Sequence, residues 1–416
     1  MLLRAVHDPP ANQLDKFAKH IIPVIALLAD RLYTPLEYVN HPYILIEDDT
    51  IVEVASQSTR SLPRGAEVVE FRDAVLAPGF VDIHIHGGAG HDVMNDDTTG
   101  ARAMEGLLAS HGVTSYFPTT VTAPIDMTLS ALDRLASQID QAERDATGGI
   151  RQAQPLGIHL EGPFLSHTRR GVHPPANLEF PSLELFDRFW QAARGRIRFL
   201  TIAPELEGAE EVIAEAARRG VCVSLGHSDA DYNAARTAVT AGARHATHTF
   251  NAMRPLDHRE PGIVGEILTD SRLSADIIAD GIHLAPPIVE LFLKAKGIDS
   301  AVLITDATAA TGMPEGRYRL GLLEVEVKDG RCLSDGRLAG SVLTMDRAVR
   351  NVMQFAHWDL PQALRLASLN PARVAHLSDR GKLEAGLRAD IVVLTPKGEV
   401  RATILRGSVP ESTVKR

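Results

Sequence analysis

Residues 78–87 read PGFVDIHIHG, an apolar run that carries two histidines two positions apart. Because side chains alternate along a strand, His84 and His86 are expected to point to the same face. This run is the first of eight short apolar runs that alternate with amphipathic helical segments. They cover residues 79–85, 115–118, 156–160, 197–202, 221–225, 245–249, 273–278 and 301–305. Strict alternation indicates a parallel α/β sheet, and a count of eight predicts a closed (β/α)8 TIM barrel.

Both ends of the chain are richer in strand patterns than this alternating middle. We therefore predict a small β-sandwich domain built from residues 21–75 and 381–416, and a barrel at residues 76–380. Residues 1–20 show no periodic pattern and are predicted to be an N-terminal extension. The apolar run at 21–29 faintly resembles a signal peptide, but a buried strand is the favoured interpretation.

The composition argues against several classes of partner. The chain has 416 residues, with 43 basic and 53 acidic side chains and a formal net charge of −10. Such acidity disfavours nucleic acid or an anionic membrane as a partner. No apolar run reaches the roughly 20 residues of a membrane-spanning helix. The two cysteines, Cys222 and Cys332, are too few for a disulfide framework and favour a reducing, cytoplasmic location.

Imidazole and carboxylate side chains stand at the ends of the predicted strands. They are His84, His86, Glu161, His227, His248 and Asp306. The carboxyl ends of barrel strands meet at one mouth, where active sites lie. Any one of these residues could be an ordinary hydrogen-bonded group, and Asp306 could be a helix N-cap. Six of them at separate strand ends nevertheless predict a divalent metal centre.

The two acidic residues in this set, Glu161 and Asp306, suggest specific roles. Glu161 precedes Gly162-Pro163, so a turn is expected to hold its carboxylate at the mouth. No lysine occurs between Lys19 and Lys294, which excludes a carbamylated lysine as a bridging ligand over most of the barrel. Glu161 is the obvious substitute. Asp306 beside a metal could take a proton from water and return it to a leaving amine.

Longer sequence segments around these residues resemble one family. The HxH pair on strand one, the histidines on strands five and six and the aspartate on strand eight resemble the amidohydrolase superfamily. Seven strings resemble its N-acetylglucosamine-6-phosphate deacetylase branch: PGFVDIHIHG (78–87), GIHLEGPF (157–164), LGHS (225–228), ATHTFNAM (246–253), HREPG (258–262), DGIH (280–283) and LAGS (338–341). Together they are far more specific than HxH alone, and the resemblance spans roughly residues 40–400.

This resemblance implies a ligand set and a mechanism. Glu161, His227 and His248 would hold the principal divalent metal, with zinc favoured over iron, manganese or cobalt. Asp306 would be the catalytic acid/base, and His173 would approach the scissile carbonyl. Retention of His84 and His86 leaves a place for a second metal per chain. The implied substrate contacts are Val172, His173, Asn251, Ala252, Arg259, His283, Ala339 and Gly340, with Arg259 reaching the phosphate in the site of a neighbouring subunit of a homodimer.

The implied reaction acts on a small phosphosugar. It is hydrolysis of the acetamide of N-acetyl-D-glucosamine 6-phosphate to D-glucosamine 6-phosphate and acetate, a step of amino-sugar catabolism. The alternatives are deacetylation of the galactosamine epimer, hydrolysis of an N-acyl amino acid or a cyclic amide, and an inactive barrel that serves as a scaffold. A scaffold predicts lost ligands, and none is missing here. Arg259 could still be a surface ion-pair partner, and His173 an ordinary loop histidine.

Overall fold

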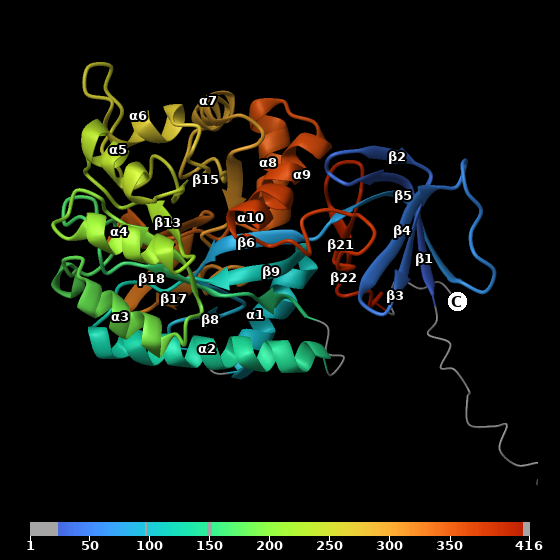
Figure 1. Ribbon diagram of the computed structural model, residues 1–416, viewed down its shortest axis with the longest axis horizontal. Helices are drawn as coiled ribbons and strands as arrows, with labels where there is room; N and C mark the ends of the chain where they lie inside the picture. The colour runs from blue at the N-terminus through green and yellow to red at the C-terminus, as the bar shows by residue number, and fades with distance from the viewer. Residues whose placement is uncertain (1–23, 96–97, 148–151, 411–416) are drawn as a thin grey trace, which may run out of the picture.

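The computed structural model describes residues 24–95, 98–147 and 152–410. A large body of strands wrapped by helices lies beside a smaller, strand-only body (Figure 1). The predicted extension at residues 1–20 lies outside the described residues. Within the described chain, no helix combines the length and apolar character needed to cross a membrane.

The large body is a closed barrel of eight strands, and all eight predicted strands are present. They are β6 (Phe80–Ile85), β9 (Val113–Pro118), β11 (Ile158–Glu161), β12 (Ile197–Ile202), β13 (Cys222–Leu225), β14 (His245–Ala246), β15 (Ala275–Ile278) and β16 (Ala301–Ile304). Pairing is parallel throughout. The short strand β10 (Gln154–Pro155), just before β11, pairs with β9, and a parallel bridge between Thr119 and His159 continues this pairing. The Thr249 N–H donates to Asp276 O between the sixth and seventh strands. A parallel bridge between Ile85 and Ala307 joins the eighth strand to the first and closes the barrel.

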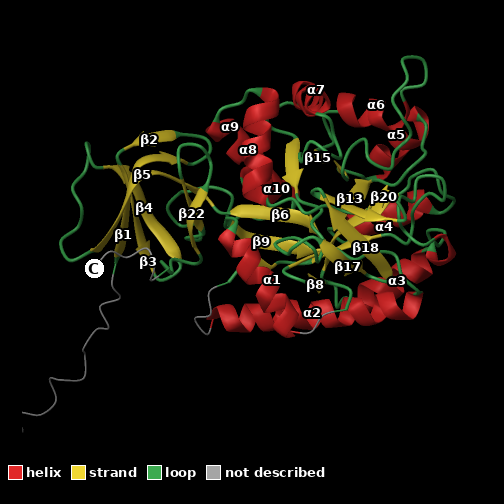
Figure 2. Cartoon of the chain, turned by 180° about the vertical axis from the view of Figure 1, so that it is seen from behind, coloured by secondary structure: helices red, strands yellow, loops and turns green. Residues whose placement is uncertain are grey.

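Helices cover the outside of these strands (Figure 2). They are α1 (Thr98–Ser110), α2 (Ile125–Thr147), α3 (Leu183–Ala192), α4 (Ala209–Arg218), α5 (Tyr232–Ala241), α6 (Gly262–Thr269), α7 (Pro286–Lys296), α8 (Met345–Ala356), α9 (Leu360–Ala367) and α10 (Leu369–Val374), with a 3₁₀ turn at Pro175–Asn177. Side-chain caps start several of them; the Asp231 carboxylate, for example, accepts from Ala234 N at the start of α5. The apolar faces of the helices and strands form the largest core cluster, so the barrel is a rigid frame for the strand ends.

The small body is a seven-stranded sheet with strands from both chain ends. They are β1 (Ile25–Tyr33), β2 (Tyr38–Asn40), β3 (Pro42–Glu47), β4 (Thr50–Ser56), β5 (Glu67–Pro78), β21 (Ile391–Leu394) and β22 (Val400–Ile404). A β-sandwich has two sheets, and the prediction of one is wrong, because hydrogen bonds join all seven strands into one sheet. Both faces are apolar: Leu27 and Ala26 on β1 belong to different core clusters. The domain boundaries near residues 75 and 380 stay a prediction.

A four-stranded antiparallel meander follows the eighth barrel strand and was not predicted. Its strands are β17 (Gly316–Leu320), β18 (Leu323–Lys328), β19 (Arg331–Ser334) and β20 (Arg337–Leu338). A two-stranded ribbon of β7 (Gly87–Gly88) and β8 (His91–Asp92) follows the first barrel strand. Leu320 and Leu338 from the meander reach the mouth of the barrel, where they line its cavity.

Candidate active site

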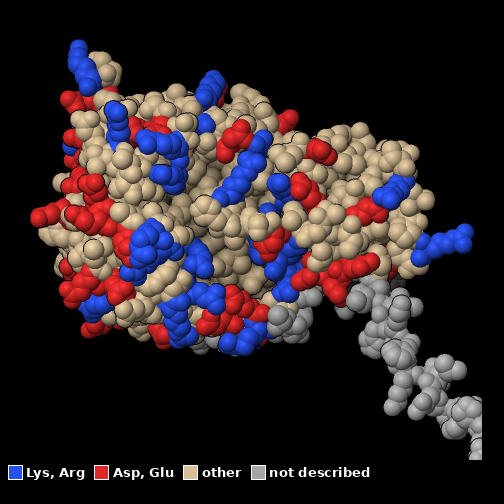
Figure 3. All heavy atoms as spheres, in the orientation of Figure 1, with Lys and Arg blue, Asp and Glu red and all other residues tan. Residues whose placement is uncertain are grey.

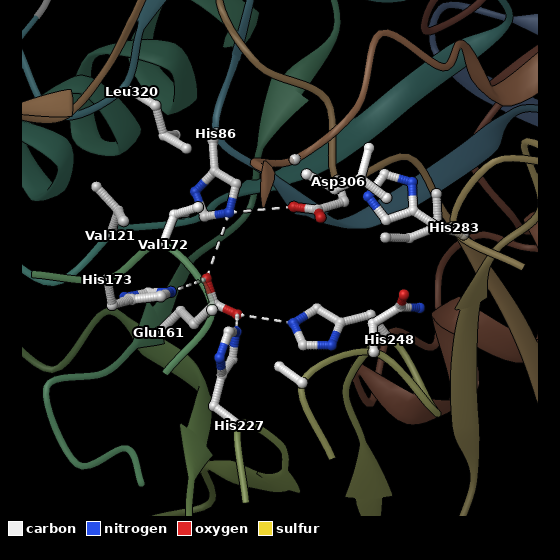
Figure 4. Close-up of a pocket in the computed structure, with 16 residues that line it drawn as sticks. His86, Val121, Glu161, Val172, His173, His227, His248, His283, Asp306 and Leu320 are labelled. Atoms are coloured by element: carbon white, nitrogen blue, oxygen red, sulfur yellow. Dashed lines mark hydrogen bonds and ion pairs between the residues drawn. The ribbon is translucent and has the colours of Figure 1, made fainter. Parts of the chain in front are cut away.

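A cavity of about 200 Å³ opens at the carboxyl ends of the barrel strands. His86, Glu161, His227, His248 and Asp306 all line it (Figure 4). His84, the sixth member of the predicted set, lies just behind His86 and is fully buried, with 3.2 Å between the two Nε2 atoms. The structure therefore brings together all six residues that the strand ends suggested.

Glu161 lies at the centre of this cluster. Its Oε1 is 3.1 Å from Nε2 of His248 and 3.3 Å from Nε2 of His227. Its Oε2 is 3.3 Å from Nε2 of His86 and 3.6 Å from Nε2 of His84. Imidazoles from three separate strand ends thus converge on one buried carboxylate.

Asp306 supplies the second carboxylate, directly after β16. Its Oδ1 is 3.2 Å from Nε2 of His86 and 3.5 Å from Nε2 of His84. Its backbone N–H donates to His84 O, which fixes it against the first strand. Gly340 crosses over it with φ +60°, and a Cβ there would lie 2.9 Å from Asp306 O, so only glycine fits.

The strand exits are turned sharply to aim these side chains across the mouth. His227, His248 and Asp306 have φ values of 47°, 30° and 51°, in the left-handed region that non-glycine residues rarely adopt. Such backbone costs on the order of 1–3 kcal/mol per residue and persists where surrounding contacts enforce it. At His248 the enforcing contact is a hydrogen bond from its backbone N–H to the buried Asp276 carboxylate.

Backbone carbonyls fix the protonation of two of the imidazoles. Nδ1 of His86 is 3.0 Å from Thr119 O, and Nδ1 of His227 is 3.0 Å from Arg169 O. A carbonyl only accepts, so each Nδ1 carries a proton, and whenever the ring is neutral its Nε2 lone pair is directed at Glu161. Lone pairs that face a carboxylate repel it unless a cation lies between them. This orientation is the one that metal-binding histidines adopt.

His173 has the opposite arrangement. The backbone N–H of Thr122 donates to its Nδ1 at 3.3 Å, and Thr122 Oγ1 is 2.8 Å from the same atom. Because Nδ1 accepts, Nε2 carries the proton in the neutral ring and points it into the cavity, 3.6 Å from Glu161 Oε2. His173 is therefore placed as a hydrogen-bond donor, although it also lies within a cluster able to hold a metal.

The charges of the cluster balance without an ion only if imidazoles are protonated. Burial opposes ionisation of Glu161, yet His84 and the imidazole hydrogen bonds hold its pKa well below the usual range. Burial also opposes ionisation of Asp306, but a hydrogen bond from His86 lowers its pKa to about 2. Against burial, the same carboxylates raise the pKa of His86 and bring that of His248 to about 9. Two anionic carboxylates thus face two protonated rings, and a divalent cation would balance the same charge with neutral rings.

The predicted substrate contacts divide into two groups. Val172, Asn251, Ala252, His283 and Gly340 line the cavity. The Nδ1 of His283 is 2.7 Å from the Asp280 carboxylate, which leaves its Nε2 for a ligand. Ala339 is buried beneath the meander rather than on the cavity wall. Arg259 is exposed on a projecting loop and does not line the cavity of its own chain.

Several residues that shape this site were missed from the sequence. Thr119 and Thr122, which orient His86 and His173, follow the second strand; their position at a strand exit was the available signal. Asp276 lies inside a strand and Leu320 in the unpredicted meander, so neither stood at a predicted strand exit.

Comparisons with known proteins agree with this geometry. The sequence matches the amidohydrolase family over residues 75–409. It is 36% identical over 376 residues to the N-acetylglucosamine-6-phosphate deacetylase of Lysinibacillus sphaericus, covering 89% of this chain and 93% of the relative. It is 37% identical over 387 residues to the N-acetylgalactosamine-6-phosphate deacetylase of Escherichia coli O157:H7, covering 92% and 98%. A mutant N-acetyl-D-glucosamine-6-phosphate deacetylase from Mycobacterium smegmatis, solved in complex with N-acetyl-D-glucosamine-6-phosphate, superposes with a TM-score of 0.86 at 36% identity and covers 93% of this chain and 99% of its own.

Proposed function

The chain belongs to the amidohydrolase family, and from this premise we propose that it hydrolyses the acetamide of N-acetyl-D-glucosamine 6-phosphate to D-glucosamine 6-phosphate and acetate. It is a hydrolase of the deacetylase type. The observation that carries the proposal is the convergence of Glu161, Asp306 and the imidazole cluster in one buried cavity. An inactive scaffold would have no need of such an arrangement.

Glu161, His227 and His248 would hold the principal divalent metal. The lone pair of the His227 ring and the charge of Glu161 support this assignment. His84 and His86 would contribute to a second ion, and this mixed nitrogen and oxygen set suits zinc, with iron, manganese and cobalt as alternatives. When bound, a divalent metal supplies Lewis acidity toward the acetamide carbonyl and toward water.

Asp306 and His173 would perform the remaining chemistry. Asp306, ionised at neutral pH, accepts the proton of the attacking water and returns it to the departing nitrogen. The Nε2–H of His173 donates to the carbonyl oxygen as negative charge develops there. His283, Asn251, Ala252, Val172 and Gly340 surround the rest of the substrate.

The phosphate has to be captured by local groups. On the face seen in Figure 3, acidic and basic side chains are interspersed, and the formal net charge of the chain is −10, so the overall field does not attract an anion. Arg259 would bind the phosphate from a neighbouring subunit of a homodimer, since it is exposed and does not line the cavity of its own chain. The two buried free thiols fit a cytoplasmic location.

Deacetylation of the galactosamine epimer is the second candidate, because a relative of that name matches at 37% identity. Acetate release from a panel of N-acetylated glucosamine and galactosamine, each with and without the 6-phosphate, together with N-acetyl amino acids, separates the possibilities. Fastest release from the glucosamine phosphate supports the proposal. Release only from the galactosamine phosphate, or from N-acetyl amino acids, would refute it.

A further inference from the structure

One end of the cavity is an apolar wall. Val121, Val172 and Leu320 line it on the side of His173, and His283 lies on the opposite side (Figure 4). Val121 and Leu320 are each only 3% exposed. The His283 side chain is 7% exposed and offers a ring nitrogen. The cavity is therefore apolar at one end and polar at the other.

The proposed substrate has the same polarity. Its carbonyl carbon bears an oxygen, a nitrogen and a methyl group that point in three different directions. The Nε2–H of His173 takes the oxygen, and Asp306 faces the nitrogen. The polar sugar, attached through that nitrogen, requires the polar end near His283. The remaining direction, which the methyl group must take, leads to the apolar wall.

This wall is held rigidly in place. The residue after Leu320 is Gly321, whose N–H donates to the Asp92 carboxylate at 2.5 Å and whose carbonyl accepts from Asn95 Nδ2 at 3.2 Å. Gly321 has φ +58°, and a Cβ there would lie 2.5 Å from Cγ1 of Val121. The hydrogen bonds tie the meander to the segment that follows the first barrel strand, and Gly321 packs closely against Val121 at the exit of the second strand, so the wall is held in a fixed position.

We propose that Leu320 and Val121 end the acyl side of the site and restrict hydrolysis to short N-acyl groups, acetyl above all. This inference rests on the proposed deacetylase function. A longer acyl chain must overpack the rigid wall. The expected penalty lowers kcat/KM for an N-butyryl substrate by about 5- to 150-fold relative to N-acetyl. Replacing leucine with alanine removes three carbons, more than the two that butyryl adds to acetyl.

The test compares N-acetyl-, N-propionyl- and N-butyryl-glucosamine 6-phosphate as substrates of the wild-type chain and of Leu320→Ala. We expect the ratio of kcat/KM for the butyryl substrate to kcat/KM for the acetyl substrate to rise at least about tenfold in the variant. A change of about tenfold is the smallest effect expected when an apolar pocket gains or loses space for one methylene group. Leu338→Ala is the matched control. It makes the same substitution in the same meander, on a residue that lines the cavity but is 36% exposed, and it should keep the wild-type ratio.

The outcomes separate this inference from the function on which it rests. If Leu320→Ala changes all three substrates by the same factor, or if Leu338→Ala shifts the ratio equally, the acyl wall is overturned while deacetylation stands. A wild-type chain that releases no acid from any of the three overturns the proposed function and the wall with it. If Leu320→Ala does not fold, Leu320→Val and Val121→Ala carry the same expectation with a smaller shift.

Discussion

Replacement of Arg259 by alanine tests both phosphate recognition and the working assembly. The side chain is exposed and has no hydrogen bond or ion pair among the described residues. Its loss should therefore leave the melting temperature unchanged. A charged hydrogen bond lost from a bound phosphate costs about 1.5–3 kcal/mol, which predicts a roughly 10- to 150-fold lower kcat/KM on the phosphosugar. The unphosphorylated sugar should react at nearly the wild-type rate. Arg72→Ala, in the small sheet, is the control at an exposed arginine.

Mixed subunits decide where this arginine acts. We would combine Arg259→Ala chains with Asp306→Asn chains under conditions that allow subunit exchange. If Arg259 acts in trans, a mixed dimer contains one site with both groups intact. Activity then returns to at most about a quarter of wild type, because half of the dimers are mixed and one site in two is complete. No recovery despite proven exchange would refute action across an interface, and equal losses on both sugars would remove Arg259 from phosphate binding.

The remaining predictions concern the metal cluster. Glu161→Gln should nearly abolish bound metal and activity, since a neutral amide loses the charge that holds the cation; near-normal metal content would contradict the assignment. Asp306→Asn should keep most of the metal but lower kcat by roughly 10²–10⁴-fold, and a loss below about tenfold would exclude Asp306 as the acid/base. For His84→Ala with His86→Ala we expect about one metal per chain and substantial activity; collapse of activity with loss of one equivalent would show that two ions are needed. Metal binding near pH 7 should release up to two protons, because the raised pKa values of His86 and His248 keep both rings protonated in the metal-free protein. Affinity should therefore fall as the pH is lowered, and calorimetry in buffers of different ionisation enthalpy counts the protons; a pH-independent affinity would contradict the charge balance.

The barrel could be predicted because its signals are local. Each strand is a short apolar run, and the position of a polar residue at the end of that run fixes its place at the mouth. Glu161, His227 and Asp306 could be placed together in this way without knowledge of any contact. The meander of residues 316–338 was missed because it interrupts the alternation of strands and helices, although its residues 323–328 alternate apolar and charged side chains and the Asp-Gly pair at 329–330 indicates a hairpin turn.

The roles of the individual histidines could not be read in the same way. His173 and His227 are both buried beside Glu161, and their sequence neighbourhoods do not distinguish a donor from a ligand. The distinction depends on the hydrogen-bond partner of each Nδ1 atom. The backbone N–H of Thr122 donates to Nδ1 of His173, whereas Nδ1 of His227 donates to the Arg169 carbonyl. Such partners become visible only when the fold brings the segments together.

The metal site and the fold depend on each other for the same reason. The proposed ligands Glu161 and His248 are 87 residues apart in the chain. The unfolded chain is therefore expected to have no site of comparable affinity. A cation that binds only the folded chain stabilises it by RT ln(1 + [M]/Kd), about 2.7 kcal/mol at a hundredfold excess over Kd. That gain is comparable to the backbone cost of one strained strand exit, on the order of 1–3 kcal/mol at a residue such as His248. In the metal-bound state, the binding free energy therefore offsets the strain of a left-handed turn that orients a proposed ligand. In the metal-free chain, only contacts such as the hydrogen bond to the Asp276 carboxylate stabilise that turn.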